Sequence, residues 1–429
     1  MGADTTGDGI AYLDVMAPDF RPDSAEVMAA RDAHWYARTA FGYALLGYKQ
    51  TSAVLGDSRF ARTPLEWALI MRGVTSGPVF DWLRSIILST EGVDHLRLRR
   101  LVSKAFTRRS VDRLRPLMST VANEMVDRFA KTGQCEFMAD FADHYPVRII
   151  CELLGVPPAQ QDSFREWTDD LGLAFSPDVQ SYMDRIEAAL AGLFHSTDTL
   201  IEYRRDHPGP DLLSALIEAE EAGDRLSTQE LRVMVSTLLF AGHETTRNQL
   251  GRAMVLFADH PDQWQRLAEQ PDLAAQATEE VFRVVPSVPL NARITTDPIT
   301  VDGLDIPANS VLHLLIAAAN TDPKVFGPGG FDITARRPAH PLTLGGGVHH
   351  CLGAALARAE IAEALPILAR RLPGIQLAGP VEWREVGIIG PRQLPLRFAV
   401  PTSLSGFGSA TAGAVSRPES THEDDRLAG

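Results

Sequence analysis

The sequence predicts a mainly α-helical protein that carries a small amount of antiparallel β-sheet. The residues Ser227-Thr-Gln-Glu230 form a capping box, and the helix that they open meets no break before His260-Pro261. Residues 117–222 contain several amphipathic stretches, which glycine and proline clusters separate. Between residues 287 and 312, short apolar runs alternate with turn residues, a pattern typical of antiparallel strands.

Length and composition are those of an ordinary globular protein. The chain has 429 residues, of which 45% are hydrophobic and 22% are charged, so it can bury a large core. No linker-like stretch interrupts residues 11–401, and we therefore expect a single domain there. Residues 1–10 are expected to be disordered, as is the tail 402–429, which is rich in small polar residues and then acidic.

Charge and cysteine content exclude several classes of protein. The net charge of −14 argues against nucleic-acid binding, which needs a basic face. No run reaches the ~18 apolar residues that span a bilayer, and the acidic N-terminus is unlike a signal peptide. Cys135, Cys151 and Cys351 give no disulfide framework and fit a reducing compartment. We therefore expect a cytoplasmic monomer without membrane or nucleic-acid partners.

The N-terminal part of the chain gives mixed signals. Residues 43–54 combine strand-like and helical patterns, and we expect a small sheet region there. Residues 59–94 hold too many glycines and prolines for one long helix, so they predict an irregular flap that lines a pocket or covers the core. Arg62, Arg72 and Arg84 in this flap could meet an acidic substrate group, but a solvated position is the simpler expectation for each.

Polar residues interrupt the middle of the long helix that Ser227 opens. Residues 233–241 are almost wholly apolar, which predicts burial on most sides. Gly242 then costs about 1 kcal/mol relative to alanine in a helix, and Glu244, Thr245 and Thr246 bring polar groups that need partners. In the simplest alternative, a threonine bonds back to the carbonyl group four residues earlier and the glutamate reaches solvent. A buried helix that breaks local rules in this way predicts a functional site.

Three consecutive glycines, residues 345–347, precede Cys351 and a strongly helical run from residue 352 onward. Glycine permits backbone angles closed to other residues and lets another group approach the main chain. Cys351 is therefore expected at a helix N-terminus, where N–H groups and the helix dipole lower the pKa of a thiol. Such a thiolate can ligate the metal of a flat cofactor; the alternative is a small buried hydrophobe beside a turn.

This loop resembles the haem-binding loop of the cytochrome P-450 family. The family pattern is Phe-Gly-x-Gly-x-(His/Arg)-x-Cys-x-Gly, and its counterparts here are Leu344, Gly345, Gly347, His349, Cys351 and Gly353. The resemblance implies a single-domain bundle of helices around haem b, with small antiparallel sheets and with Cys351 as the proximal ligand of the iron. Leu344 departs from the pattern, because the family has a phenylalanine ring that packs against the cysteine ligand.

The interrupted helix resembles the same family. Residues 241–246, Ala-Gly-His-Glu-Thr-Thr, match its signature Ala-Gly-x-(Asp/Glu)-Thr-(Thr/Ser) without departure. The resemblance implies that Gly242 opens the helix above the iron. It also implies that Glu244 and Thr245 are the catalytic pair that delivers protons to bound O2.

Two further motifs resemble parts of the family that surround the haem. His95 and Arg99 share one face of a basic helix, and they resemble the His-x-x-x-Arg pair that holds a haem propionate; a solvated basic helix is the alternative. Glu280 and Arg283 resemble the buried Glu-x-x-Arg ion pair. A second arginine, either Arg336 or Arg337, completes that pair, and the one-residue insertion before them leaves the choice open.

The resemblance assigns roles to residues of this chain. The implied cofactor-binding residues are His95, Arg99, Ala241, Arg293, Leu344, Gly345, His349, Cys351 and Gly353. By position, the candidates for substrate contact are Leu239, Gly242, Val288, Leu290, Asn291, Ile388 and Ile389. For each aliphatic residue among them, packing in the core is an equal expectation.

A basic patch on this acidic chain predicts an acidic partner. Between residues 91 and 115 there are eight Lys and Arg residues against three acids, and such a patch steers an acidic protein. The resemblance implies a ferredoxin, which receives electrons from NAD(P)H through a ferredoxin reductase. The expected docking residues are Arg97, Arg100, Lys104, Arg108 and Arg109.

The function that the resemblance implies is oxidation by O2 at a cysteine-ligated haem. The substrate would be a small, largely apolar organic molecule such as a secondary metabolite. One alternative is a haem-thiolate enzyme that uses peroxide or couples rings without inserting oxygen; the intact Glu244-Thr245 pair disfavours the use of peroxide. A remote alternative is a non-catalytic metal or haem sensor, in which His349, His350 and Cys351 could bind zinc.

Overall fold

A computed structural model gives the fold, and it describes residues 9–17, 19–103, 106–176, 178–221, 226–384 and 388–400. Of the two segments expected to be disordered, 402–429 and residues 1–8 lie outside these ranges. Ile10 lies inside them and is buried. The packed part of the chain therefore includes a residue that we expected to be disordered.

Helices dominate the described chain, as predicted. The helices of the first half are α1 (Ala25–Ala33), α2 (Tyr48–Gly56), α3 (Trp67–Ile70), α4 (Pro78–Ser85), α5 (Gly92–Ser103), α6 (Arg108–Asp112), α7 (Arg115–Phe129), α8 (Tyr145–Leu154), α9 (Gln161–Gly172), α10 (Met183–Asp206) and α11 (Leu212–Glu221). They are followed by α12 (Thr228–Ala258), α13 (Pro261–Glu269), α14 (Ala274–Val284), α15 (Ile316–Asn320), α16 (Pro323–Phe326) and α17 (Ala354–Arg371). Several breaks fall at the predicted clusters: Gly155, for example, ends α8 in the left-handed conformation.

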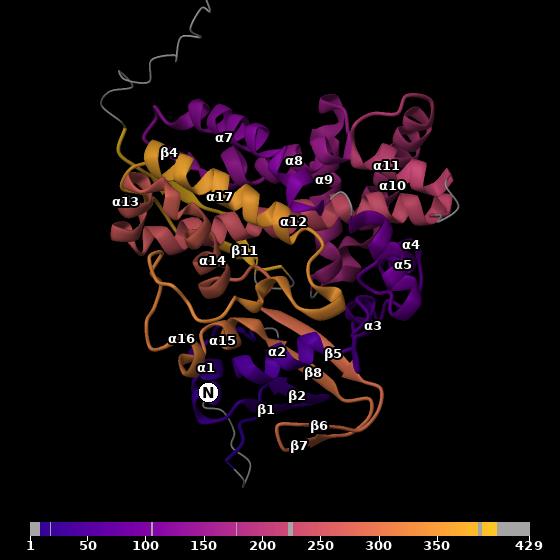
Figure 1. Ribbon diagram of the computed structural model, residues 1–429, viewed down its shortest axis with the longest axis vertical. Helices are drawn as coiled ribbons and strands as arrows, with labels where there is room; N and C mark the ends of the chain where they lie inside the picture. The colour runs from indigo at the N-terminus through magenta and orange to yellow at the C-terminus, as the bar shows by residue number, and fades with distance from the viewer. Residues whose placement is uncertain are drawn as a thin grey trace, which may run out of the picture.

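The capping box predicted from the sequence opens α12. The Ser227 hydroxyl accepts the N–H of Glu230 (3.2 Å), and the Glu230 carboxylate accepts the N–H of Ser227 (2.7 Å). The helix is buried along most of its length and packs against α8, α9 and α10. Figure 1 shows that α12 and α17 cross the helical part of the molecule, and that the largest sheet lies at the other end of the molecule.

The largest sheet has five strands in the order β1-β2-β8-β5-β3. These strands are β1 (Tyr36–Thr39), β2 (Gly42–Leu45), β3 (Phe60–Arg62), β5 (Leu290–Thr295) and β8 (Val311–Leu315). The smaller antiparallel sheets contain β4 (Gln134–Glu136), β12 (Pro395–Arg397) and β9 (Gln376–Leu377); β6 (Ile299–Val301) and β7 (Leu304–Ile306); and β10 (Glu382–Arg384) and β11 (Gly390–Gln393). The prediction of a mainly helical fold with small antiparallel sheets is confirmed, although β2 and β8 pair in parallel.

The N-terminal sheet region is shorter than predicted. Residues 42–45 form β2, but residues 48–54 belong to α2, so the expectation of sheet there is wrong. The reason lies far along the chain. The backbone N–H of Tyr48 donates to the carboxylate of Asp322 (3.0 Å), which satisfies one of the free donors at the start of the helix.

The predicted flap, residues 59–94, consists of the short elements β3, α3 and α4. It covers the core, because the indole N–H of Trp82 in α4 donates to the hydroxyl of Ser236 in α12 (3.1 Å) and both residues are buried. It also lines a cavity through Arg62, Ile87 and Leu88. No helix in the described ranges has the length and apolarity that crossing a membrane requires. All three cysteines are free, as predicted.

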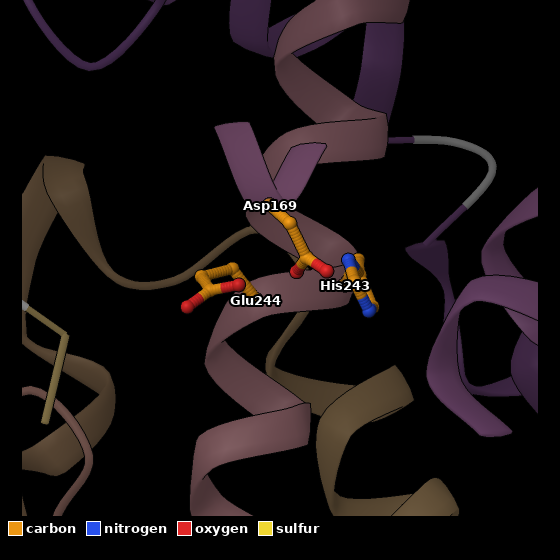
Figure 2. A group of neighbouring side chains, drawn as sticks. All are labelled: Asp169, His243 and Glu244. Atoms are coloured by element: carbon orange, nitrogen blue, oxygen red, sulfur yellow. The ribbon is translucent and has the colours of Figure 1, made fainter. Parts of the chain in front are cut away.

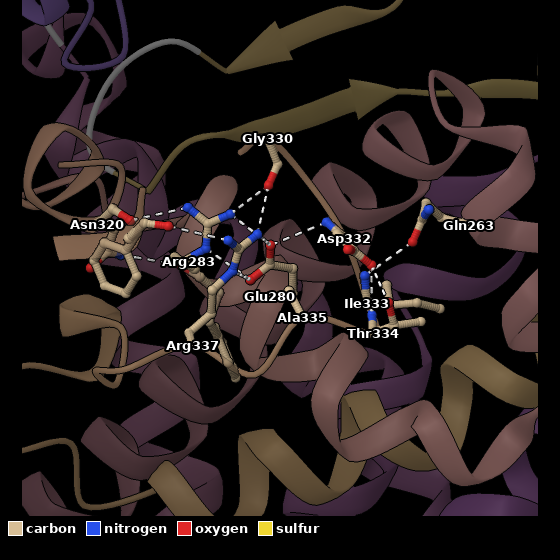
Figure 3. A network of polar contacts seen from close by, with 12 residues as sticks. Gln263, Glu280, Arg283, Asn320, Gly330, Asp332, Ile333, Thr334, Ala335 and Arg337 are labelled. Atoms are coloured by element: carbon tan, nitrogen blue, oxygen red, sulfur yellow. Dashed lines mark hydrogen bonds and ion pairs between the residues drawn. The ribbon is translucent and has the colours of Figure 1, made fainter. Parts of the chain in front are cut away.

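A buried ion-pair network joins α14 to the segment that precedes the Cys351 loop, as Figure 3 shows. Glu280 accepts two hydrogen bonds from Arg283 (2.6 and 2.8 Å) and two from Arg337 (2.5 and 3.2 Å). Arg337, not Arg336, is therefore the second arginine that the sequence left open. Arg336 is exposed. Because both arginines outweigh the effect of burial, the pKa of Glu280 lies below its ordinary value.

We predict that Arg337→Ala destabilises the fold and that Arg336→Ala does not. The first change removes two charge-assisted hydrogen bonds from a buried carboxylate, and such bonds contribute about 1.5–3 kcal/mol each. The free energy of unfolding in urea measures the difference. Equal stabilities of the two variants would contradict the assignment.

Candidate active site around Cys351

Cys351 stands just before α17, as the sequence predicts. A short 3₁₀ segment (Gly347–His349) precedes it, and Gly353 is the N-cap of α17. The backbone N–H of Cys351 donates to the carbonyl oxygen of Leu344 (2.8 Å), and the N–H of Gly353 donates to the cysteine sulfur. The first contact fixes the backbone of Cys351, and the second fixes its sulfur.

The glycines of the loop act mainly through packing against α2. Gly347 has a φ of +62°, and a Cβ there would lie 2.6 Å from the carbonyl oxygen of Leu55. A Cβ at Gly346 would lie 3.2 Å from the Cβ of Leu55. We expected all three glycines to clear space for a cofactor. Of the three, only Gly345 lines the cavity described below.

The pKa of the Cys351 thiol departs from the expectation. Burial raises it above its ordinary value, although the N–H of Gly353 and the charges of Arg99, Arg358 and Arg62 oppose this rise. The helix N-terminus alone therefore does not produce a thiolate. Coordination to a metal ion would, because a metal-bound thiol is deprotonated.

A cavity lies between α12 and the Cys351 loop. The α12 residues that line it are Thr237, Leu238, Ala241, Gly242, Thr245, Thr246 and Gln249. Their spacing of three or four residues places them on one face of the helix. The interrupted helix and the cysteine loop, more than 100 residues apart in the sequence, thus form two walls of the same cavity.

Most of the residues that the sequence singled out line this cavity. They are His95, Arg99, Ala241, Gly242, Thr245, Val288, Asn291, Arg293, Leu344, Gly345, His349, Cys351 and Gly353. The side chains of His95, Arg99, Arg293 and His349 come from α5, β5 and the loop. The structure therefore brings together groups from four separate parts of the chain.

Four of the candidates for substrate contact do not line the cavity. Leu239 lies on another face of α12 and is buried in the main core. Leu290 precedes Asn291 in β5, so its side chain points to the opposite face of the strand, where it packs against the N-terminal cluster. Ile388 and Ile389 are also absent from the lining; the N–H of Ile389 donates to the carbonyl oxygen of Ser287 (2.8 Å).

Gly242 and Thr245 combine local structural roles with their place in the cavity wall. The Thr245 hydroxyl donates to the carbonyl oxygen of Ala241 (2.8 Å), which is the back-bonded arrangement considered as the simple alternative. A Cβ at Gly242 would lie 2.9 Å from the Ile150 side chain of α8. Gly242 therefore allows α8 to approach α12 closely, besides exposing the helix to the cavity.

Glu244 does not reach solvent, and it does not line the cavity. It is fully buried, and its carboxylate is bound by Arg384 of β10 and by the amide of Asn248 (2.8 Å). Burial alone would raise the pKa of Glu244, but Arg384 and Arg247 hold it below its ordinary value. The simple alternative of a solvated glutamate is therefore wrong.

Glu244 belongs to a polar cluster that joins α12 to α9. Asp169, His243 and Glu244 bring their ligand atoms within 4.8 Å of one another, as Figure 2 shows. Both ring nitrogens of His243 have partners, the hydroxyl of Thr168 (2.8 Å) and the carbonyl oxygen of Asp143 (3.1 Å). Since Arg384 and Arg247 would also repel a cation, we assign no metal site here.

The zinc site considered for His349, His350 and Cys351 finds no support. In the described ranges, these residues do not form a group with ligand atoms close together. The Nε2 atom of His349 contacts the carboxylate of Glu91 (3.0 Å), and burial lowers the pKa of both histidines.

Three residues of the site were missed or misplaced by sequence reasoning. Arg62, for which we favoured a solvated position, lines the cavity. Arg384 comes from a hairpin 140 residues after Glu244, and no local pattern indicates that the two meet. Glu360 of α17 is fully buried and lines the cavity, and burial raises its pKa well above the ordinary value.

We predict that Asp169→Asn makes the protein more stable relative to the wild type as the pH rises from about 4 to about 7. Burial raises the pKa of Asp169 to about 6, and Glu244 adds to this effect against Arg247, Arg384 and Arg165. The folded state therefore keeps a proton that the unfolded chain releases near pH 4, so stability falls as the pH passes through this window. Asparagine has no proton to lose.

Urea unfolding of both proteins at pH 4.5 and pH 7.5 measures the effect. Asp170→Asn is the matched control, because Asp170 forms an ion pair with Arg185 (2.5 Å) and its removal should not stabilise the fold at either pH. A stability difference between Asp169→Asn and the wild type that does not change with pH would contradict the prediction.

Comparisons with known proteins support the resemblance along most of the chain. The family model described as "Cytochrome P450" matches residues 73–372. The chain is 38% identical to luteothin monooxygenase of Streptomyces thioluteus, over 91% of this chain and 96% of that protein. It is 38% identical to mycinamicin IV hydroxylase/epoxidase of Micromonospora griseorubida, over 81% and 87%. The structure of cytochrome P450 CYP109Q5 from Chondromyces apiculatus superposes with a TM-score of 0.79 at 31% identity, over 91% of this chain and 99% of that chain.

Proposed function

Because the chain belongs to the cytochrome P450 family and is a cytochrome P450 monooxygenase, we propose that it oxidises a small, largely apolar secondary metabolite with electrons from a ferredoxin. The names of two relatives contain luteothin and mycinamicin IV, which supports this class of substrate. The observation that carries the proposal is the position of Cys351 in one wall of the cavity and of the α12 signature in another.

The residues of the cavity fit haem b. Cys351, just before the N-terminus of α17, offers its sulfur as the iron ligand. Arg99 and Arg293 offer guanidinium groups to the carboxylates of the cofactor. His95 and His349 lie beside them, with ring centroids 4.1 Å apart. When bound through Cys351, haem supplies the iron centre at which O2 is activated.

Apolar residues in the wall of the cavity favour an apolar substrate. Leu238, Ala241 and Val288 present apolar surface, and Ile87 and Leu88 extend it from the segment before α5. Burying such surface favours an apolar molecule and excludes water from the reacting atoms. Asn291 is the exception in this wall, and its amide offers one polar contact that would orient the substrate.

Thr245 and Glu244 are the groups of this chain that would handle protons. The Thr245 hydroxyl lies in the cavity wall, where it can donate to an oxygen atom of a bound ligand once it leaves the carbonyl group of Ala241. Glu244 stays ionised behind it, because Arg384 and Arg247 lower its pKa. To pass a proton to the cavity, its side chain must leave Arg384, and this ion pair would therefore control the supply of protons.

The basic face around α5 is the surface that we propose for the ferredoxin. Arg100, Arg108 and Arg109 are exposed, and so are the apolar side chains of Val93 and Leu96 in α5. Arg97 is a weaker candidate, because it pairs with Glu230 of α12. Lys104 lies outside the described residues. An acidic partner is supported by this charge, which would speed its association at low salt.

The alternative in which the enzyme uses peroxide or couples rings has a separate test. Turnover with ferredoxin, reductase and NAD(P)H is compared with turnover on hydrogen peroxide alone. We expect product only, or mainly, with the reductive system. Faster turnover on peroxide would favour the alternative.

We predict that Thr245→Ala lowers the product formed per NAD(P)H consumed by roughly tenfold and raises hydrogen peroxide release, because general acid catalysis of this kind typically contributes at least that much. NAD(P)H consumption, product and peroxide are measured in the same reaction.

Thr237→Val is the matched control for Thr245→Ala. Thr237 lies two turns earlier on the same face of α12, lines the cavity and also donates to the carbonyl oxygen four residues before it (2.6 Å). It should change substrate affinity more than coupling. Unchanged coupling in Thr245→Ala, or equal uncoupling in both variants, would contradict the role of Thr245.

A further inference from the structure

The cavity is lined by one arginine more than the two that the family resemblance assigns to it. Arg99 and Arg293 line it, and so does Arg62 at the end of β3. Arg99 donates to the carbonyl oxygen of His350 (2.6 Å) and Arg293 to that of Ala292 (2.9 Å). In the part of the chain that the structure describes, none of the three guanidinium groups has a carboxylate within ion-pair distance.

The strand register places two of these charges opposite each other. In the antiparallel pairing of β3 and β5, Arg62 faces Arg293, and like charges directly opposite destabilise a sheet. Burial and the charge of Arg293 together lower the pKa of Arg62 to about 10, although Glu91 and Cys351 oppose this change. The guanidinium of Arg62 nevertheless remains charged at neutral pH, beside an arginine that is itself buried.

Glu91 is the acid beside Arg62, and it does not neutralise the three arginines. One carboxylate oxygen of Glu91 accepts the backbone N–H of Arg62 (2.6 Å), and the other contacts Nε2 of His349 (3.0 Å). Three arginines against one glutamate leave an excess of two positive charges at this end of the cavity. A bound anion with two negative charges would remove this imbalance.

We propose that Arg62 binds a carboxylate of the haem, as a third guanidinium beside Arg99 and Arg293. The proposal rests on the proposed function, since haem b carries two carboxylates and these match the excess of two positive charges. It also explains why β3 and β5 keep two arginines in register, because the repulsion between them is relieved only when the anion is bound. Arg62 is then a positioning residue that retains the cofactor.

The same chemistry would suit the carboxylate of an acidic substrate, which is the other source of a carboxylate in this cavity. We favour the cofactor because Arg62 is paired in register with Arg293, at the end of the cavity that His95 and His349 also line. Among the apolar lining residues, Leu238 comes from α12 and Val288 from the segment before β5. If Arg62 binds the haem carboxylate, its replacement weakens haem retention; if it binds a substrate carboxylate, its replacement weakens substrate binding.

The test compares Arg62→Gln, Arg62→Lys and the wild type, each purified as the haem-loaded protein. Arg84→Gln is the control, because Arg84 lies in the same flap and is exposed. The rate of haem transfer to an excess of apomyoglobin is measured. We expect Arg62→Gln to lose haem about tenfold faster or more, because it loses a charge-assisted hydrogen bond, with Arg62→Lys intermediate and Arg84→Gln unchanged.

A second measurement distinguishes the two sources of carboxylate. Lauric acid and its methyl ester are titrated into wild type and Arg62→Gln, and the change of iron spin state is followed. Equal rates of haem loss from the wild type and from Arg62→Gln would overturn the proposal. So would an Arg62→Gln variant that retains haem like the wild type but no longer binds lauric acid while it still binds the methyl ester. The carbon monoxide spectrum of the reduced variant should keep the thiolate signature. A wild type without that signature would refute the proposed function instead.

Discussion

The site depends on one sulfur atom, that of Cys351, which backbone contacts position in the wall of a cavity. Arginine side chains give the same cavity an excess of positive charge. Two backbone contacts fix Cys351, one through the carbonyl group of Leu344 and one through the N–H of Gly353. Close packing of Gly346 and Gly347 against Leu55 ties the loop to α2. The surroundings alone do not ionise the thiol, because burial raises its pKa. In the account proposed above, the iron of haem would bind this sulfur and the haem carboxylates would pair with the arginines.

Helix α12 separates two environments that the chemistry requires. One face, marked by Ala241 and Thr245, forms a wall of the cavity. Another face carries Glu244 into a cluster of charges from α9 and β10, where Arg384 keeps the carboxylate ionised. The ion pair with Arg384 keeps Glu244 away from the cavity. Under the role proposed for Glu244, this ion pair must open before the carboxylate can pass a proton to the cavity.

Much of this arrangement was predictable from the sequence because its signals are local. The capping box at Ser227, the glycine and proline breaks and the position of Cys351 before a helix follow from neighbouring residues. The features that we did not predict depend on partners far away in the sequence. Asp322 stabilises the start of α2 where sheet was expected, and strand register sets Arg62 against Arg293.

The candidate site shows the same division. The motif residues of α12 and of the cysteine loop reach one cavity, since spacing along a helix fixes which side chains share a face. Leu239 and Leu290 pack in the core, which was the equal expectation for them, because position along a family pattern does not specify a face. The choice of Arg337 over Arg336 needed the path of the turn after Asp332, which one inserted residue changes.

The central claim is that the sulfur of Cys351 is the iron ligand. The visible spectrum of the reduced, carbon monoxide-treated protein tests it most directly. We predict the red-shifted Soret band of thiolate ligation in the wild type and its absence in a haem-loaded Cys351→His variant. A folded, haem-loaded wild type that lacks this band, or a Cys351→His variant that keeps it, would contradict the claim.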